Sequence, residues 1–265
     1  QLLDKITPST ISNFFLANSG TEAVEAALKV AKAHTENKKV LCFVNAFHGR
    51  SQGALSATWN PHYKKPFMPL LEGFIHIPFN NIEKLEEHID EVGTVLVEMV
   101  QGEGGVNPAT PEFATRLQEL CKEKNKLLII DEVQVGFCRT GKMFSFEHYG
   151  MQPDMVCMAK SIASGLPIGV LGVRNDLTLA PGTHSTTFGG NPISCAAAIA
   201  TVEHMLDEKL WEKAEKLGTY FFEKLRTLEH RLIREVRGKG LMIGVDLRIK
   251  AEPVIKELLK RNILV

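Results

Sequence analysis

Short apolar runs rich in Val and Ile alternate along the chain with longer segments in which apolar residues recur with helical period. The apolar runs predict strands at residues 39–44, 94–100, 127–130, 155–159, 168–173 and 241–247. The helical periods predict helices at residues 21–34, 111–124, 191–207 and 209–228, and another from residue 252 onward. Such alternation is typical of βα units wound around a sheet. The pattern therefore predicts an α/β fold, with a mostly parallel sheet flanked by helices.

The last part of the chain changes this order to helix, turn, strand and helix, and we place the turn at residues 237–240. The preceding helices have clear starts, because Pro111 and Pro192 each stand at a first helical position, where a missing N–H costs nothing. We therefore expect residues 1–205 to form a large domain. Residues 206–265 are expected to begin a smaller, incomplete C-terminal α+β domain.

Composition and charge exclude several classes of protein. The 265 residues are 44% hydrophobic, and 31 basic side chains balance 31 acidic ones. A chain without a basic excess lacks the field that gathers nucleic acid or an anionic membrane surface. No apolar run approaches the ~20 residues that cross a bilayer. We expect no nucleic-acid partner and no membrane partner.

Three familiar site signatures are absent or broken. The five cysteines form no C-x-x-C pair, which indicates a reducing, cytoplasmic setting. The nine histidines give no H-E-x-x-H and no Cys/His pair at ligand spacing, so we predict no metal site. Residues 136–142 nearly match a nucleotide-binding P-loop, but Met143 stands where a hydroxyl would bind Mg²⁺. We therefore reject a nucleoside triphosphatase.

A ligand-binding signal lies at residues 18–22, whose sequence is Asn-Ser-Gly-Thr-Glu. Ser19 and Glu22 have the spacing of a capping box at the start of a predicted helix. Free N–H groups and the positive end of the helix dipole make such a start suitable for a phosphate. A capped helix without a ligand explains the same spacing, so neighbouring residues must decide.

Two predicted strands lead into residues that can carry chemistry. One ends in Asp131 and Glu132, and another leads directly into Lys160. Ligands bind α/β proteins at the carboxyl ends of the strands, and burial of a lysine there would favour its uncharged, nucleophilic form. Alone, Asp131 could cap a loop and Lys160 could be a solvated surface residue. Together with an anion-binding helix start, they supply what an aldehyde cofactor with a phosphate requires.

Six short motifs stand in order along the chain. They are Asn18-Ser19-Gly20-Thr21-Glu22-Ala23, Phe47-His48-Gly49-Arg50, Gln101-Gly102-Glu103-Gly104-Gly105, Asp131-Glu132-Val133-Gln134, Ala159-Lys160 and Thr187-Phe188-Gly189-Gly190-Asn191-Pro192. Over essentially the whole chain they resemble the class III aminotransferases of fold type I. The resemblance is closest to the acetylornithine aminotransferase group and its lysine-biosynthesis relatives. Family members extend further at both ends, so we expect this chain to be a truncated piece.

The resemblance implies pyridoxal 5′-phosphate as the cofactor. The residues that would bind it are Gly20, Thr21, Phe47, Asp131, Glu132, Val133, Gln134, Lys160 and Thr187. Lys160 would hold the cofactor covalently and move protons, and Asp131 would pair with the ring nitrogen. Gly20 and Thr21 would hold the phosphate, while Thr187 would reach the phosphate of a neighbouring subunit. The implied assembly is a homodimer with shared active sites.

Val133 and Gln134 would pack against the cofactor ring and bond its phenolic oxygen, and Phe47 would stack on the ring. Three residues are implied to contact substrate. Arg50 would clamp a carboxylate, and Thr186 would touch the substrate. Glu103 would influence which substrate end enters the site, unless it only structures its glycine-rich loop.

The resemblance implies transfer of the terminal amino group of N-acetylornithine, or a similar N-blocked diamino acid, to 2-oxoglutarate. The products are a semialdehyde and glutamate, in arginine or lysine biosynthesis. A lysine-pathway enzyme acting on an aminoadipate semialdehyde and a broader ω-aminotransferase remain alternatives. From another class, the chain could be a non-catalytic relative that serves only as an interaction module.

Overall fold

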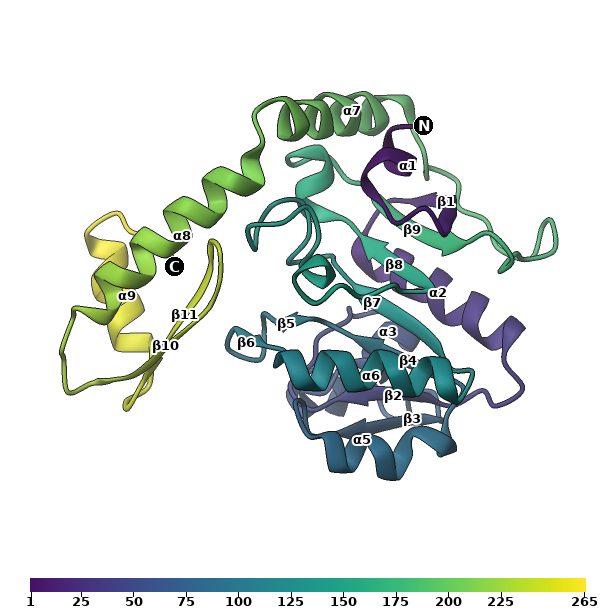
Figure 1. Cartoon of the computed structure of the whole chain (residues 1–265), viewed down its shortest axis with the longest axis horizontal. Helices are drawn as coiled ribbons and strands as arrows, with labels where there is room; N and C mark the ends of the chain where they lie inside the picture. Colours follow the sequence, from purple (N-terminus) through teal and green to yellow (C-terminus); the bar gives the residue numbers. More distant parts are fainter.

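The computed structural model describes residues 1–265 and is built around a seven-stranded sheet (Figure 1). The strands of this sheet are β1 (Ile11–Ala17), β2 (Val40–Phe43), β3 (Phe74–Ile77), β4 (Thr94–Val97), β7 (Leu127–Asp131), β8 (Met155–Met158) and β9 (Gly169–Arg174). Their order is β1-β9-β8-β7-β4-β2-β3. All neighbours from β3 to β8 are parallel, whereas β9 is antiparallel to both β8 and β1. The prediction of a mostly parallel sheet is confirmed.

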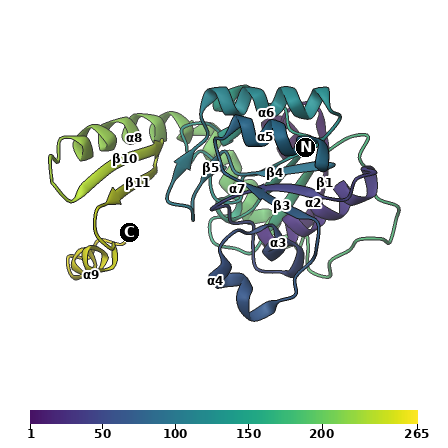
Figure 2. The same ribbon diagram turned by 90° about the horizontal axis from the view of Figure 1, so that it is seen from below.

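Helices cover both faces of this sheet. The α-helices of this part are α1 (Leu2–Ile6), α2 (Gly20–His34), α3 (Gln52–Ala57), α4 (Pro61–Lys64), α5 (Ile82–His88), α6 (Pro111–Glu123) and α7 (Pro192–Asp207). Short 3-10 helices are η1 (Lys65–Phe67), η2 (Ile89–Glu91), η3 (Ser145–Tyr149) and η4 (Lys160–Ala163). Helices α5 and α6 lie on one face, and α2 and α3 lie on the other (Figure 2).

The central strands are apolar throughout because both of their faces are covered. In β7, Leu128 and Ile130 join the core that includes residues of α5 and α6, whereas Ile129 joins the core that includes α2. Small residues such as Ala23 and Ala27 let α2 pack closely on the sheet, and both are fully buried. The alternation of side chains thus builds two cores and leaves the strand ends free to carry polar groups.

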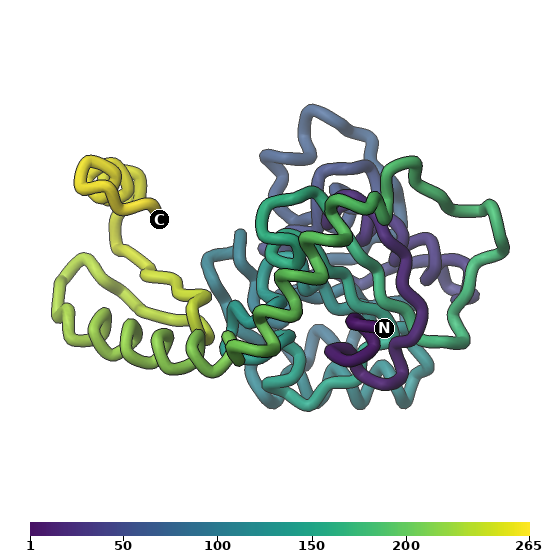
Figure 3. The backbone as a smooth tube through the Cα atoms, turned by 90° about the horizontal axis from the view of Figure 1, so that it is seen from above, coloured from purple at the N-terminus to yellow at the C-terminus, as the bar shows by residue number.

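The chain leaves the main sheet after α7. It continues as α8 (Leu210–Arg226), the hairpin of β10 (Ile233–Lys239) and β11 (Met242–Leu247), and α9 (Glu252–Lys260). This part extends away from the main sheet, as Figures 1 and 3 show. A two-stranded sheet of β5 (Val100–Gln101) and β6 (Asn107–Pro108) completes the fold.

The predicted turn at residues 237–240 is misplaced. Residues up to Lys239 belong to β10, because strand pairing continues until Lys239 faces Met242. Gly240 and Leu241 therefore form the turn, and Gly240 adopts a left-handed φ of 53°. None of the helices combines the length and apolar character needed to span a membrane.

Candidate active site

A cavity of about 420 Å³ opens beside the carboxyl ends of the parallel strands. The loops after β2, β4, β7 and β8 reach it, together with the start of α2 and the segment before β9. This is the edge at which α/β proteins bind ligands. The structure brings these predicted residues together in its lining: Gly20, Thr21, Phe47, Arg50, Asp131, Val133, Gln134 and Lys160.

The start of α2 offers unpaired backbone donors to this cavity. Ser19 caps the helix by accepting from the Glu22 backbone N–H at 3.4 Å, and the Glu22 carboxylate accepts from the Asn18 backbone N–H at 2.7 Å. The amides of Gly20 and Thr21 precede the first helical hydrogen bond and remain available. Free N–H groups at a helix start are suited to an anion, and phosphate binding by this helix start stays a prediction.

Gly20 is required by the close approach of α2 to the loop after β7. A Cβ atom at this position would lie 2.5 Å from Cγ1 of Val133, which is a severe overlap. The absence of a side chain therefore lets the start of α2 stand next to the loop that begins at Asp131. A larger residue would separate the two parts of the site.

Asp131 is held rigidly at the end of β7. Its side chain is buried, with Oδ2 2.8 Å from Nδ1 of His48 and Oδ1 accepting from the Val133 backbone N–H at 3.0 Å. His48 is itself buried, and its Nε2 has no partner. The sequence motif contained His48, but we assigned it no role; its approach to Asp131 depends on the pairing of distant strands.

Glu98 is a second buried carboxyl group at this cavity, and it is not among the predicted site residues. It follows β4 and accepts from the Phe47 backbone N–H at 2.9 Å. Burial, opposed by His48 and reinforced by Asp131, raises the pKa of Glu98 to about 7. β4 ends at Val97, so Glu98 stands at the carboxyl end of a strand, as Asp131 does at the end of β7. The strand predicted at residues 94–100 ran past this end and hid the signal.

Lys160 lies one strand away from Asp131. It follows Ala159 beyond β8, which pairs with β7 in the register Asp131 to Cys157. Its backbone has a left-handed φ of 47°, an uncommon conformation for a residue with a side chain. The desolvation expected from the strand sequence is wrong for this chain, because Lys160 is exposed while the strand itself is buried. The residues at 164–167 that follow are also exposed, so the cavity is open on this side.

Three further predicted residues, Gln134, Glu132 and Glu103, differ in where they stand relative to the cavity. Gln134 lines it and packs over Gly102, where a Cβ would meet its Oε1 at 1.8 Å. Glu132 turns away into the core, and its carboxylate accepts from the Ser145 hydroxyl at 2.6 Å. Glu103 lines a neighbouring cavity of about 230 Å³ that shares Phe47 with the first.

Thr186 and Thr187 do not line the cavity. The Thr186 hydroxyl accepts from the Asn18 side-chain amide at 3.1 Å, so Thr186 stands beside the capped start of α2. Thr187 is exposed and has no side-chain partner within the chain. A role for Thr187 toward a neighbouring subunit therefore stays a prediction.

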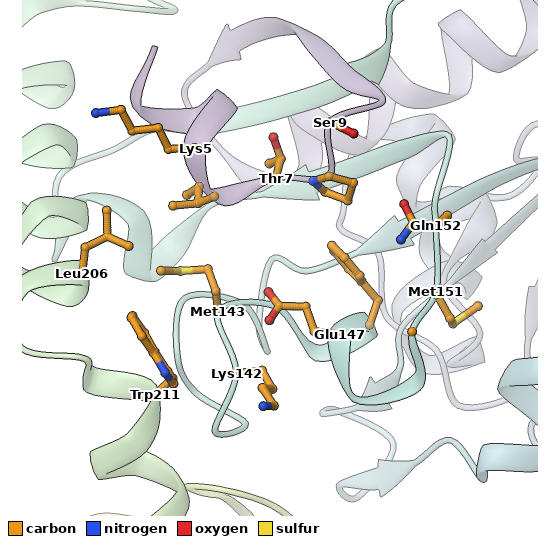
Figure 4. Close-up of a pocket in the computed structure, with 14 residues that line it drawn as sticks. Lys5, Thr7, Ser9, Lys142, Met143, Glu147, Met151, Gln152, Leu206 and Trp211 are labelled. Carbon is orange, nitrogen blue, oxygen red and sulfur yellow. The ribbon is translucent and has the colours of Figure 1, made fainter.

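A cavity of about 600 Å³, larger than the one that Lys160 lines, lies elsewhere (Figure 4). The N-terminal segment around Lys5, the segment from Lys142 to Gln152, and Trp211 of α8 line it. Lys142 belongs to the near-match to a P-loop. That segment leads into η3 rather than an α-helix, and its Gly141 amide donates to the Cys138 carbonyl at 3.1 Å. It therefore lacks the phosphate-cradling geometry of a P-loop.

The cavity of about 420 Å³ that Lys160 lines fits pyridoxal phosphate in the chemistry of its lining. The start of α2 offers N–H donors for the phosphate, and Asp131 offers a buried carboxylate for the ring nitrogen. Lys160 supplies a primary amine for the aldehyde, and Phe47 and Val133 supply apolar surface for the ring. The volume lies within the range of about 300–1,000 Å³ that is usual for ligand sites. No group of His, Cys, Asp and Glu side chains is arranged to hold a metal ion.

Comparison with known families agrees with this lining. The model of the family described as aminotransferase class-III matches residues 1–265. The chain belongs to the class-III aminotransferase family.

Curated relatives support this membership. An acetylornithine aminotransferase of Caldanaerobacter subterraneus subsp. tengcongensis is 45% identical over 258 residues, covering 93% of this chain and 66% of the relative. A LysW-aminoadipate semialdehyde/glutamate semialdehyde transaminase of Sulfolobus acidocaldarius is 44% identical over 268 residues, covering 100% of this chain and 69% of the relative. The chain thus spans about two thirds of the length of these relatives.

Solved structures have the same fold. An ornithine aminotransferase of Toxoplasma gondii, whose description mentions partial occupancy of PLP at the active site, superposes with a TM-score of 0.92 at 37% identity. That match covers 96% of this chain and 64% of the other. An ω-transaminase of Thermomicrobium roseum also gives 0.92, at 33% identity, covering 99% of this chain and 70% of the other.

Proposed function

We propose that this chain is the catalytic part of a pyridoxal-phosphate-dependent aminotransferase. Its substrates are N-acetylornithine, or a similar N-blocked diamino acid, and 2-oxoglutarate. The terminal amino group replaces the keto oxygen of 2-oxoglutarate, which gives glutamate, and the donor carbon becomes the aldehyde of a semialdehyde. The observation that carries the proposal is the convergence of Lys160, Asp131 and the free start of α2 on one cavity.

When bound, pyridoxal phosphate supplies an aldehyde and a ring that accepts electrons. Asp131 keeps a proton on the ring nitrogen, and each pKa unit that it secures corresponds to ~1.4 kcal/mol. The hydrogen bonds of Asp131 with His48 and the Val133 amide fix the carboxylate in place for this task. The amine of Lys160 moves the proton of the donor carbon, and Arg50 binds the donor carboxylate with its two-pronged guanidinium.

The protein works as a homodimer in which each copy completes the other's site. Helix α7 supports this, because it is apolar around most of its circumference and yet leaves Ile193 73% exposed and Ile199 50% exposed. A helix that is apolar on all sides is normally buried. Thr187, in the exposed segment before α7, then contacts the cofactor phosphate of the second copy.

Residues 206–265 are part of a small domain, and the five free cysteines support a reducing, cytoplasmic setting.

The Sulfolobus acidocaldarius relative favours a second candidate donor, because its name is that of a lysine-pathway transaminase and its identity to this chain is similar to that of the first relative. The Thermomicrobium roseum structure similarly supports a broader ω-aminotransferase. Kinetic comparison of N-acetylornithine, a blocked aminoadipate-derived amine and simple ω-amines separates the three. The donor with the largest kcat/KM identifies which of the three kinds of aminotransferase this chain represents.

The first test is the visible absorption spectrum of the protein with pyridoxal phosphate, before and after N-acetylornithine is added. The proposal predicts a shifted cofactor band that converts to that of the aminated cofactor on addition of the donor, and reverts with 2-oxoglutarate. A band that forms but ignores every amine supports instead a non-catalytic, cofactor-binding relative. A protein that is folded by circular dichroism and forms no band contradicts the proposal.

A further inference from the structure

Arg50 is held by two aromatic rings and has no polar side-chain partner in the chain. Its guanidinium carbon lies 3.9 Å from the ring centroid of Tyr63 and 5.7 Å from that of Phe47. The two rings meet edge to face, with centroids 5.9 Å apart and planes at 84°. Arg50 makes no ion pair and no side-chain hydrogen bond within the chain. The two rings therefore hold the guanidinium in place while its N–H donors stay free of partners in the chain.

The Tyr63 ring stands on a segment that is itself anchored. The Asn60 side chain caps α4 by accepting from the His62 amide at 2.9 Å. At the other end of α4, the Lys64 ammonium donates to the carbonyl oxygens of Ser56 and Thr58 at 3.0 and 2.9 Å. The start and the end of this one-turn helix are thus tied to polar groups, so the ring between them is a fixed platform.

The platform also separates two cavities. Tyr63, Phe47 and Glu103 line the cavity of about 230 Å³. Phe47 and Arg50 line the cavity of about 420 Å³, which Lys160 also lines. If the Tyr63 ring were removed, Arg50 would lose its nearest partner and would be free to leave the cavity that it shares with Lys160. The orientation of the guanidinium therefore depends on Tyr63 more than on any polar partner.

We propose that Tyr63 is a positioning residue that aims Arg50 at the carboxylate of the amino donor, and so makes the site selective for donors that carry a carboxylate. This inference rests on the proposed function, in which Arg50 binds that carboxylate. It predicts a loss that is confined to carboxylate-bearing donors. A residue needed only for folding would impair all donors alike.

The kinetic test compares N-acetylornithine with 1-aminopentane, which has the amine but no carboxylate, in the cofactor-bound protein. Tyr63→Ala should raise the KM for N-acetylornithine about five- to tenfold, the size expected for loss of one cation–π contact, and leave kcat within about twofold. The KM for 1-aminopentane should not change. Tyr63→Phe, which keeps the ring, should behave as the wild type. Equal KM values in Tyr63→Ala and the wild type, or equal losses for both donors, would overturn the assignment.

Binding provides a readout that does not require turnover. N-acetylnorvaline has the carboxylate and the blocked nitrogen but no amine to transfer, and calorimetry measures its affinity. Tyr63→Ala should weaken this binding about five- to tenfold, and Tyr63→Phe should not. A wild-type protein that binds N-acetylnorvaline without transaminating N-acetylornithine refutes the proposed reaction, while the two variants still decide the role of Tyr63. Unchanged binding in Tyr63→Ala refutes that role.

Discussion

The two ends of the cavity differ in how completely this chain builds them. At the cofactor end, Asp131 and His48 are buried and paired, and Gly20 is in close contact with Val133. At the substrate end, where the amine of Lys160 must reach both cofactor and donor, Arg50 and Lys160 are exposed. One chain thus builds a rigid, buried end that suits the ring and phosphate of the cofactor, whereas the substrate end has few partners of its own.

This difference follows from where the residues stand. The cofactor end is built on strand ends and a helix start, which the two cores hold in position. The substrate end is built on a stacked arginine and on exposed loop residues. Precise chemistry needs rigid support, and at the substrate end this chain supplies it to Arg50 only through the Tyr63 and Phe47 rings. Substitutions at the two ends should therefore differ in kind.

The largest effect is expected at Lys160. Lys160→Ala should reduce transamination to the uncatalysed background, because the proposed function uses this amine to hold the cofactor and to move the proton. The fold should persist, since the side chain is exposed and makes no hydrogen bond or ion pair in the chain. Turnover and circular dichroism measure the two effects.

Lys160→Arg is the matched control for charge. It keeps the cation but lacks a nucleophilic amine, so it should be equally inactive. A small primary amine added to the solution should restore part of the activity of Lys160→Ala and none of that of Lys160→Arg. Turnover by Lys160→Ala without such an amine would show that another residue carries the chemistry.

The second largest effect is expected at Asp131, in the buried cofactor end. Asp131→Asn keeps the size of the side chain and an oxygen for the Val133 amide but removes the charge. We expect kcat to fall at least about 100-fold, or ~3 kcal/mol in activation free energy, because the ring nitrogen is no longer held protonated.

Asp154→Asn is a control outside the cavity. Asp154 accepts from the Leu128 amide at 2.8 Å and pairs with Arg174, so its loss should lower stability and leave kcat unchanged. Similar kcat values in Asp131→Asn and the wild type would remove Asp131 from the mechanism.

Much of the buried end could be predicted from the sequence, because central strands and their ends leave a strong pattern. Strands β7 and β8 are covered on both faces and appear as continuous apolar runs, so Asp131 and Lys160 were predictable as residues at strand ends. The edge strands β1 and β3 were missed. They carry polar or half-exposed residues, which weaken the apolar signal.

The partners of the site residues were harder to predict. The contact between His48 and Asp131 joins residues that are 83 positions apart, and it exists because the loops after β2 and β7 converge at one edge. Tyr63 belongs to a one-turn helix with no periodic pattern, so nothing in its local sequence points to Arg50. Patterns locate residues on elements, whereas pairings arise from tertiary packing.

The third prediction concerns the stability of the fold rather than catalysis, and it is made for Glu132. Its carboxyl group is fully buried, and burial raises its pKa to about 7 from an ordinary value of 4.5. Between these two pH values the native state binds the proton and the unfolded state does not. The free energy of unfolding contributed by Glu132 therefore falls as pH rises through this window, by on the order of 3 kcal/mol.

Glu132→Gln keeps a carbonyl oxygen for the Ser145 hydroxyl and the Phe146 amide but cannot ionise. Urea unfolding at several pH values should show the wild type losing stability relative to the variant as pH rises from about 4.5 to about 7. Comparison of the two proteins cancels the similar contribution of Glu98. Parallel stability curves would mean that the buried carboxyl group does not titrate in this range.

The smallest effect is expected where the two parts of the cofactor end touch. Gly20→Ala places a methyl group 2.5 Å from Cγ1 of Val133, so the start of α2 must shift away from the loop after β7. We expect the Kd of pyridoxal phosphate to rise about tenfold, or ~1.4 kcal/mol. The double variant Gly20→Ala/Val133→Ala removes the overlap and should recover part of the affinity, as measured by fluorescence titration. If Val133→Ala worsens binding as much in the Gly20→Ala background as in the wild type, the two residues act independently, and close contact between them is not what shapes the phosphate site.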